Sequence, residues 1–243
     1  MNKGIILWCW ILLVNTSVFS QSVKEQFAKS ILTNNISSQK SIAKNLSGSY
    51  STFAYTYYGL MLGNLPKQSI LITNAYDDTF PLRVLQLTRS VRTDVAVISA
   101  AMLKTDSLYR DRISKRYSLK LEGKSITKQI QIIINNHNNV FVSTTVNHSI
   151  WYKPKYYLIG LSIQPNNNQN TNRLIAFYQS FQKLKLNTYQ FNHSDRQIIQ
   201  NLLPPLITLY KNGNSLPNLK ADILMIADIV GKRDKVIKIL EAK

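Results

Sequence analysis

Two short, continuously apolar runs mark the hydrophobic pattern of the chain, at residues 69–74 (SILITN) and 95–100 (VAVISA). Runs of this length between turn residues are typical of strands buried on both faces of a sheet. Between them, apolar residues at helical spacing follow Asp78, Thr79 and Pro81, which are residue types that begin helices. The pattern therefore predicts a strand–helix–strand crossover with two parallel strands.

The rest of the pattern predicts two more strands and a series of helices. A third strand is expected at residues 140–146 and a fourth, either antiparallel or at an edge, at residues 156–163. Helical spacing predicts helices over residues 49–62, 105–117, 125–135, 173–185, 194–211, 218–230 and 233–242. The expected fold class is α/β: a mostly parallel, Rossmann-like three-layer sheet domain with a C-terminal appendage similar to a helical repeat.

The N-terminal segment has the pattern of a secretory signal peptide. Lys3 precedes an apolar run at residues 5–14, and Val18 and Ser20 suit a signal peptidase that cleaves before Gln21. A membrane anchor needs roughly 20 apolar residues, so an uncleaved anchor is the weaker alternative. Export to the periplasm follows from this interpretation.

Three segments are expected from these patterns. Residues 1–20 are the signal peptide, residues 21–165 the α/β domain and residues 166–243 a C-terminal helical region. After cleavage, we expect no segment that spans a membrane. Cys9 is the one cysteine of the chain and leaves with the leader, so neither a disulfide nor a cysteine-ligated metal is expected.

The charge balance is strongly basic. The chain has 30 Lys and Arg against 12 Asp and Glu, a net charge of +18. Part of the lysine content is explained by the Asn-, Ile- and Lys-rich composition of an AT-rich genome. The remaining charge favours acidic protein surfaces, anionic lipid surfaces or anionic envelope polymers. Nucleic acid is not an expected partner because the protein is exported.

The densest group of charges falls on the predicted helix over residues 105–117. Arg110, Arg112, Lys115 and Arg116 form a candidate face for an anionic partner, with Asp111 as the acidic residue among them. The alternative is an ordinary solvated helix face.

Residues 70–117 (ILITNAYDDTFPLRVLQLTRSVRTDVAVISAAMLKTDSLYRDRISKRY) resemble a region of a known family. The region of the family that they resemble is the soluble extracytoplasmic C-terminal part of bacterial membrane proteins of unknown function. These proteins are described as protein O-mannosyltransferase-like and of glycosyltransferase-C type. Members carry TNGDNDTFPLWYLQ, then RxDVxVxN and LLNTDWY. Residues 140–163 and the terminal helices also have counterparts, and the most specific match is residues 74–82.

The chain also departs from this family. Ala75 and Tyr76 replace the Gly and Asn of the GDND motif, and Arg83 stands where members have Trp. The membrane portion, which would hold the transferase chemistry, is replaced here by the signal peptide. The resemblance therefore implies the fold, an extracytoplasmic setting and a role beside envelope glycan or secretion machinery, without transferase activity.

A candidate pocket rim lies at the carboxyl end of the first predicted strand, where open α/β sheets place their ligand crevices. Its residues are Asn74, Asp77, Asp78 and Thr79. The two aspartates could bind a cation or sugar hydroxyls, or act as an acid/base pair. The favoured alternative is structural: Asp78 or Thr79 caps the helix and Asp77 closes a turn.

Several chemistries are disfavoured by the sequence. His137, His148 and His193 are too scattered to indicate a metal site. The chain has no GxSxG, HExxH, P-loop or glycine-rich dinucleotide motif. We therefore assign no catalytic residue, cofactor or metal.

The leading hypothesis is a non-enzymatic module of the cell envelope that binds a protein partner or an anionic polymer. One alternative is an accessory or catalytic component of envelope glycan machinery, with Asp77 and Asp78 as catalytic residues. A second alternative is a subunit of an outer-membrane assembly or secretion complex.

Overall fold

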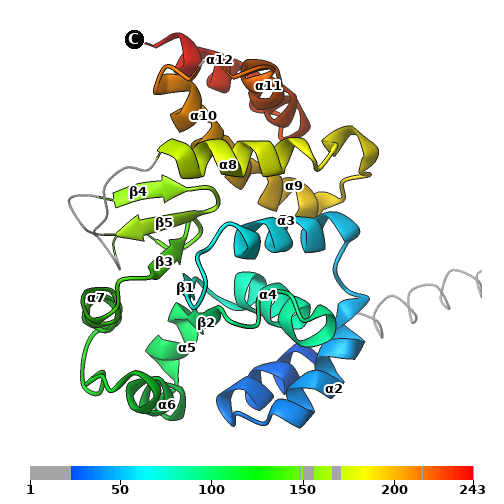
Figure 1. Cartoon of the computed structure of the whole chain (residues 1–243). Helices are drawn as coiled ribbons and strands as arrows, with labels where there is room; N and C mark the ends of the chain where they lie inside the picture. The colour runs from blue at the N-terminus through cyan, green and yellow to red at the C-terminus, as the bar shows by residue number, and fades with distance from the viewer. Residues whose placement is uncertain (1–22, 148, 150–155, 166–170, 215, 243) are drawn as a thin grey trace, which may run out of the picture.

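The structure is a computed structural model that describes residues 23–147, 149, 156–165, 171–214 and 216–242 (Figure 1). The predicted signal peptide at residues 1–20 and His148 lie outside the described residues. The first described element is a helix over residues 23–32.

The strands of the described residues form one small mixed sheet, with the order β2-β1-β3-β5-β4. Each strand has four residues: β1 (Ile70–Thr73), β2 (Ala96–Ser99), β3 (Val140–Ser143), β4 (Tyr156–Ile159) and β5 (Ser162–Pro165). β1 pairs in parallel with β2 and with β3, which confirms the predicted parallel strands. β5 pairs antiparallel with β3 and β4.

Helices make up 63% of the described chain. They are α2 (Ile36–Ser47), α3 (Thr52–Gly63), α4 (Tyr76–Arg89), α5 (Ala100–Thr105), α6 (Ser107–Tyr117), α7 (Ile126–Asn136), α8 (Thr171–Gln182), α9 (His193–Ile199), α10 (Leu203–Lys211), α11 (Leu219–Ile229) and α12 (Arg233–Glu241). The expected mostly parallel, Rossmann-like sheet is therefore wrong. The fold is helix-rich around a five-stranded mixed sheet.

Gly160 explains why half of the strand pairings are antiparallel. The apolar run at residues 156–163 was expected to be one strand, but Gly160 adopts φ +60 and the chain turns there to form the β4–β5 hairpin. This backbone conformation is open mainly to glycine. A Cβ atom on Gly160 would also meet Cδ2 of the fully buried Phe177 at 2.6 Å, so both the turn and the packing require glycine.

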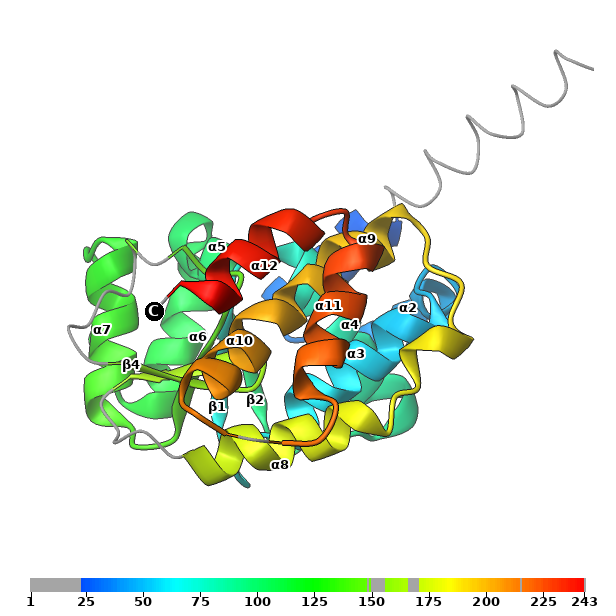
Figure 2. The same cartoon turned by 90° about the horizontal axis from the view of Figure 1, so that it is seen from above.

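The helices lie on both sides of the sheet. In Figures 1 and 2, α2, α3 and α4 lie to one side of the strands and α5, α6 and α7 to the other. The later helices α8 to α12 lie above the sheet in Figure 1, where α8 contacts β4. The helices expected beyond residue 171 are thus present, while the division into two domains stays a prediction.

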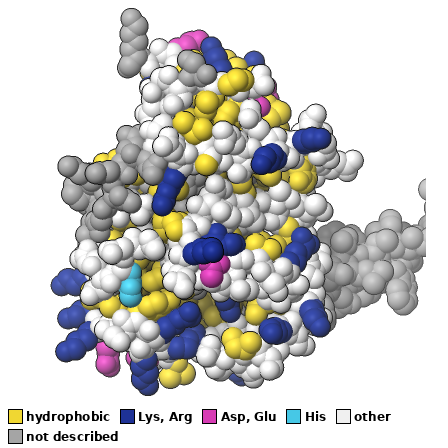
Figure 3. Space-filling view, in the orientation of Figure 1, with side chains coloured by type: hydrophobic (Ala, Val, Ile, Leu, Met, Phe, Trp, Pro, Cys, Tyr) yellow, Lys and Arg dark blue, Asp and Glu magenta, His cyan; other side chains and the backbone are white. Residues whose placement is uncertain are grey.

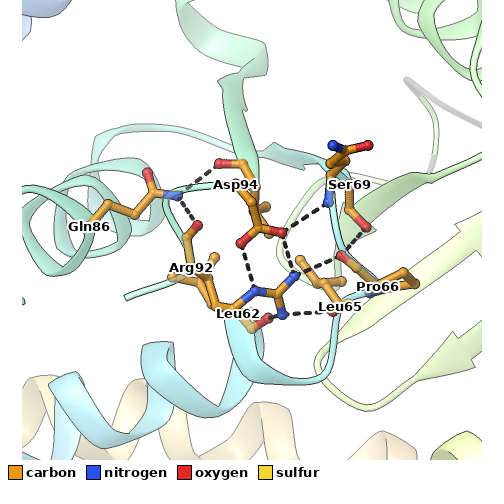
Figure 4. A network of polar contacts seen from close by, with 9 residues as sticks. Leu62, Leu65, Pro66, Ser69, Gln86, Arg92 and Asp94 are labelled. Carbon is orange, nitrogen blue, oxygen red and sulfur yellow. Dashed lines mark hydrogen bonds and ion pairs between the residues drawn. The ribbon is translucent and has the colours of Figure 1, made fainter. Parts of the chain in front are cut away.

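Arg92 holds the loop before β1 against the turn before β2 (Figure 4). Its guanidinium donates to three carbonyl oxygens at 2.7–2.8 Å, those of Leu62, Leu65 and Pro66. It also pairs with Asp94 at 2.9 Å. Arg92 and the Gln68 N–H hold the pKa of Asp94 well below its usual range. This network fixes where β1 starts and therefore where it ends.

Candidate functional site

The candidate pocket residues of the sequence lie where β1 leads into α4. Asn74 follows the last residue of β1, while Asp77, Asp78 and Thr79 lie in the first turns of α4. The N-cap of α4 is Ala75, and no side chain caps it, so the capping role expected of Asp78 or Thr79 is wrong. Thr79 instead donates its hydroxyl to the Ala75 carbonyl oxygen at 2.7 Å.

The carboxylate of Asp78 is buried and held by donors at the ends of two strands. It accepts the hydroxyl of Thr145, just after β3, and the backbone N–H of Asn74, just after β1. Burial raises the pKa of Asp78, and both hydrogen bonds oppose this rise because they favour the charged form. Asp78 is only 7% exposed. Its main role is therefore to join β1, β3 and α4.

A cleft of about 410 Å³ opens beside Asp78, where the N-terminal ends of α3, α4 and α9 meet. Three carboxylates and three tyrosines line it: Asp77, Asp78, Asp195, Tyr50, Tyr58 and Tyr76. The chain has 30 basic residues against 12 acidic ones, so this cleft is an acidic site on a basic molecule. Of the predicted rim, Asn74 and Thr79 do not line it.

Asp195 is the carboxylate that the sequence analysis missed. It forms a capping box with Asn192 at the start of α9 and accepts the hydroxyl of Ser51 at the start of α3. The Asn192-x-x-Asp195 spacing is a signal that could have placed this helix start. No sequence signal places it beside Ser51, which lies 144 residues away.

Tyr76 provides an aromatic surface at the mouth of the cleft. One face of its ring stacks on Phe80, with ring centroids 4.9 Å apart, and Phe80 packs edge-on against Phe27. Phe80 is 1% exposed but Tyr76 is 44% exposed. The ring is therefore held by the core on one face while its remaining surface is open to solvent beside Asp77.

Tyr50 and Tyr58 contribute phenol groups to the wall of the cleft. Burial raises the pKa of both tyrosines, and the nearby aspartates raise it further. Both side chains therefore stay protonated at neutral pH. The Tyr58 hydroxyl donates to the backbone oxygen of Asp77 at 3.0 Å, which ties α3 to the first turn of α4.

The three carboxylates of the cleft differ in what they can still bind. Asp78 and Asp195 already accept hydrogen bonds from hydroxyl and backbone donors. Asp77 is exposed, and no group of the described residues donates to its carboxylate. The arrangement therefore offers one free carboxylate beside an open aromatic ring, which is a binding arrangement rather than an acid/base pair.

The predicted basic face divides into two pairs. Arg110 and Arg112 are half-buried and donate to backbone carbonyls, Arg110 to Leu103 at 2.9 Å and Arg112 to Leu32 at 2.7 Å. Lys115 and Arg116 are exposed. Figure 3 shows Lys and Arg side chains gathered at the lower left of the molecule, over α6 and α7. Lys115 and Arg116 are thus exposed, while Arg110 and Arg112 bind the protein through part of their guanidinium groups.

The described residues hold neither a candidate metal site nor a helix that could span a membrane. No group of three His, Cys, Asp or Glu side chains in this part of the chain could hold a metal ion. None of the helices there is both long and apolar enough to cross a membrane.

Fold and cleft together define the class of this protein: a helix-rich α/β domain with an acidic, aromatic cleft at the carboxyl end of its parallel strands. Residues 54–205 match the family model of TMEM260-associated domain 2. This match covers more than half of the chain, and the protein belongs to that family. No curated protein and no solved structure matches the chain.

Proposed function

We propose that the protein is a non-enzymatic binding module of the bacterial cell envelope that holds a glycan in the acidic, aromatic cleft. The observation that carries this proposal is the exposed ring of Tyr76 beside the free carboxylate of Asp77. An open aromatic face packs against the apolar C–H face of a sugar ring. A carboxylate accepts hydrogen bonds from hydroxyl groups, and such charge-assisted bonds are strong.

The engagement of Asp78 and Asp195 supports binding without catalysis. A glycosidase needs two carboxyl groups that are free to exchange protons or attack the sugar. Here two of the three carboxylates of the cleft are engaged by protein donors. Asp77 alone could bind a ligand but could not supply both halves of that chemistry.

The negative charge of the cleft favours a glycan over the anionic polymer of our first hypothesis as its ligand. Among the described residues, three carboxylates and one cation, Lys24, line the cleft, so a polyanion would be repelled there. A neutral or amine-bearing sugar meets no such barrier. A protein partner seated on Tyr76 is the other outcome that the experiment below can reveal.

The proposed setting is outside the cytoplasm. The signal-peptide pattern at residues 1–20 supports export to the periplasm. The resemblance to the extracytoplasmic region of protein O-mannosyltransferase-like membrane proteins supports the same location. Within this proposal the protein acts as an accessory component of envelope glycan machinery.

Calorimetric titration with mannose and N-acetylglucosamine oligosaccharides tests the cleft. Tyr76→Ala should lower the affinity at least tenfold, which corresponds to ~1.4 kcal/mol, with little change in melting temperature because the ring is exposed. Tyr156→Ala is the matched control, since Tyr156 is 43% exposed and lies outside the cleft lining. The proposal fails if no sugar binds, or if both variants bind equally well.

A further inference from the structure

Within the described residues, the guanidinium of Arg83 donates hydrogen bonds to neutral groups alone. Arg83 lies half-buried on α4 and donates to the side-chain oxygens of Gln39 at 2.9 Å and Gln86 at 3.1 Å. Both glutamines are at most 4% exposed. Their amides fix the direction of the guanidinium group but do not compensate its charge.

A second guanidinium, that of Arg112 on α6, is anchored at the same place. Arg112 donates to the Leu32 carbonyl at 2.7 Å, and Gln39, which holds Arg83, donates to the Ser30 carbonyl at 3.1 Å. Both connections end on the last turn of the helix over residues 23–32, the dark blue helix at the bottom of Figure 1. The two arginines therefore converge from different helices.

Arg116 lies on α6 one helical turn after Arg112 and is the third arginine of this group. It follows Arg112 by four residues on α6, so the two side chains share one face of the helix. Arg116 is exposed and lies over the Tyr117 ring at 5.4 Å. Burial lowers the pKa of Arg83, and the charges of Arg116 and Arg112 lower it further. The three cations therefore repel one another.

No carboxylate in the described part of the chain forms an ion pair with this group. The ion pairs there are Arg92–Asp94 and Arg233–Asp228. Asp106 attracts Arg112, but its carboxylate caps α6 by accepting the Tyr109 N–H at 2.7 Å. The Leu32 carbonyl accepts one N–H of Arg112, and the Arg112 guanidinium lies over the Tyr109 ring at 5.0 Å. Its other N–H groups donate to no acceptor of the described residues.

We propose that Arg83, Arg112 and Arg116 form an anion site that binds a phosphate group between α4 and α6. A phosphate carries close to two negative charges at neutral pH and offers several acceptor oxygens, and guanidinium groups match these oxygens in pairs. The phosphate is either a free ion or the headgroup of a lipid. This site is separate from the glycan cleft.

Titration of the full protein with inorganic phosphate tests the site, with ionic strength held constant by NaCl. Arg116→Gln and Arg83→Gln should each weaken phosphate binding at least tenfold. Lys220→Gln, the same charge change on the exposed side of α11, should leave it unchanged. Because Arg116 is exposed, its variant stays informative even if the Arg83 variant does not fold.

Vesicles of phosphatidylcholine, with and without phosphatidic acid, distinguish the two sources of phosphate. Binding only to vesicles with phosphatidic acid, lost in Arg116→Gln and displaced by inorganic phosphate, assigns the site to a lipid headgroup. Phosphate binding without vesicle binding assigns it to the free ion. Equal phosphate affinity in Arg116→Gln and Lys220→Gln overturns the proposal. Tyr76→Ala should leave phosphate binding intact, so this site and the glycan cleft are tested separately.

Discussion

The acidic cleft and the arginine group between α4 and α6 both contain partly buried charge, but the hydrogen-bond partners of that charge differ between the two. In the cleft, Asp78 and Asp195 each accept hydrogen bonds from hydroxyl and backbone N–H donors. Between α4 and α6, the described hydrogen-bond acceptors of Arg83 and Arg112 are neutral oxygens, and Arg112 also lies over the Tyr109 ring at 5.0 Å. Backbone donors at helix starts stabilise a carboxylate well, whereas two amide oxygens leave a guanidinium group uncompensated.

This difference separates structural charge from charge available to a ligand. A buried charge that already has hydrogen-bond partners in the protein leaves little for a ligand to bind. A buried charge without an opposite partner costs free energy unless a ligand supplies one. Asp78 and Asp195 therefore hold the walls of the cleft together, while the arginines themselves would contact an anion.

The largest expected effect is at Asp195. In Asp195→Ala, Ser51 and the Asn192 N–H lose their acceptor in a buried site. The free energy of unfolding should fall by about 3 kcal/mol, measured by urea denaturation. Asp234→Ala removes an exposed carboxylate from the first turn of α12 and should cost less than about 1 kcal/mol. Equal losses would show that Asp195 is not structural.

Arg92 pairs with an opposite charge and also donates to three backbone carbonyl oxygens, so its removal should cost more than an ordinary surface change. Arg92→Met loses three carbonyl acceptors and the partner of Asp94. We expect a loss of about 2 kcal/mol in the free energy of unfolding. Arg196→Met, on the exposed side of α9, should change stability by less than about 0.5 kcal/mol. If Arg92→Met leaves the free energy of unfolding unchanged, the contrast between Arg92 and Arg83 is lost.

Asp78 and Asp94 should make stability depend on pH with opposite signs. The pKa of Asp78 is raised in the folded state, so its contribution falls as pH rises above the ordinary carboxyl range near ~4. The pKa of Asp94 is lowered, so its contribution is lost as pH falls below that range. Urea unfolding of Asp78→Asn between pH 4 and 7 should show a smaller decline in stability than the wild type. An identical decline would contradict the burial of Asp78.

The smallest expected effect is at Arg116. Arg116→Gln removes a like charge four residues from Arg112 and should raise the free energy of unfolding by about 0.3 kcal/mol in dilute NaCl. The gain should vanish in ~1 M NaCl, where charges are screened beyond about 3 Å. Thermal unfolding of both proteins at the two salt concentrations measures this. A loss of stability at low salt would indicate that Arg116 has a protein partner.

The sequence predicted the local elements better than their assembly. The unit β1–α4–β2 was expected from two apolar runs and the helix between them, and the structure confirms its parallel pairing. The hairpin at residues 156–165 was missed because the segment YYLIGLSI was interpreted as one strand, although a glycine inside a strand pattern can mark a bend. That turn is enforced by glycine conformation and by the packing of Phe177, which lies on the next helix, α8.

The candidate site shows the same division. Asp77 and Asp78 were found because the motif lies directly after a predicted strand. Asp195, Tyr50 and Tyr58 belong to the cleft, yet no local pattern links them to residues 77–78. For the basic face, the sequence identified four basic residues but could not show that Arg110 and Arg112 bind backbone carbonyls.

By itself the sequence determined the positions of most helices beyond residue 49, the crossover of β1 and β2 and the positive charge of the chain, because periodicity, turn residues and composition are local properties. Only the tertiary structure decided which charges are satisfied and which face a ligand. That outcome depends on donors and acceptors far apart in the chain, such as Ser51 with Asp195 and Gln39 with Arg83. Burial then sets how much each unmatched charge costs.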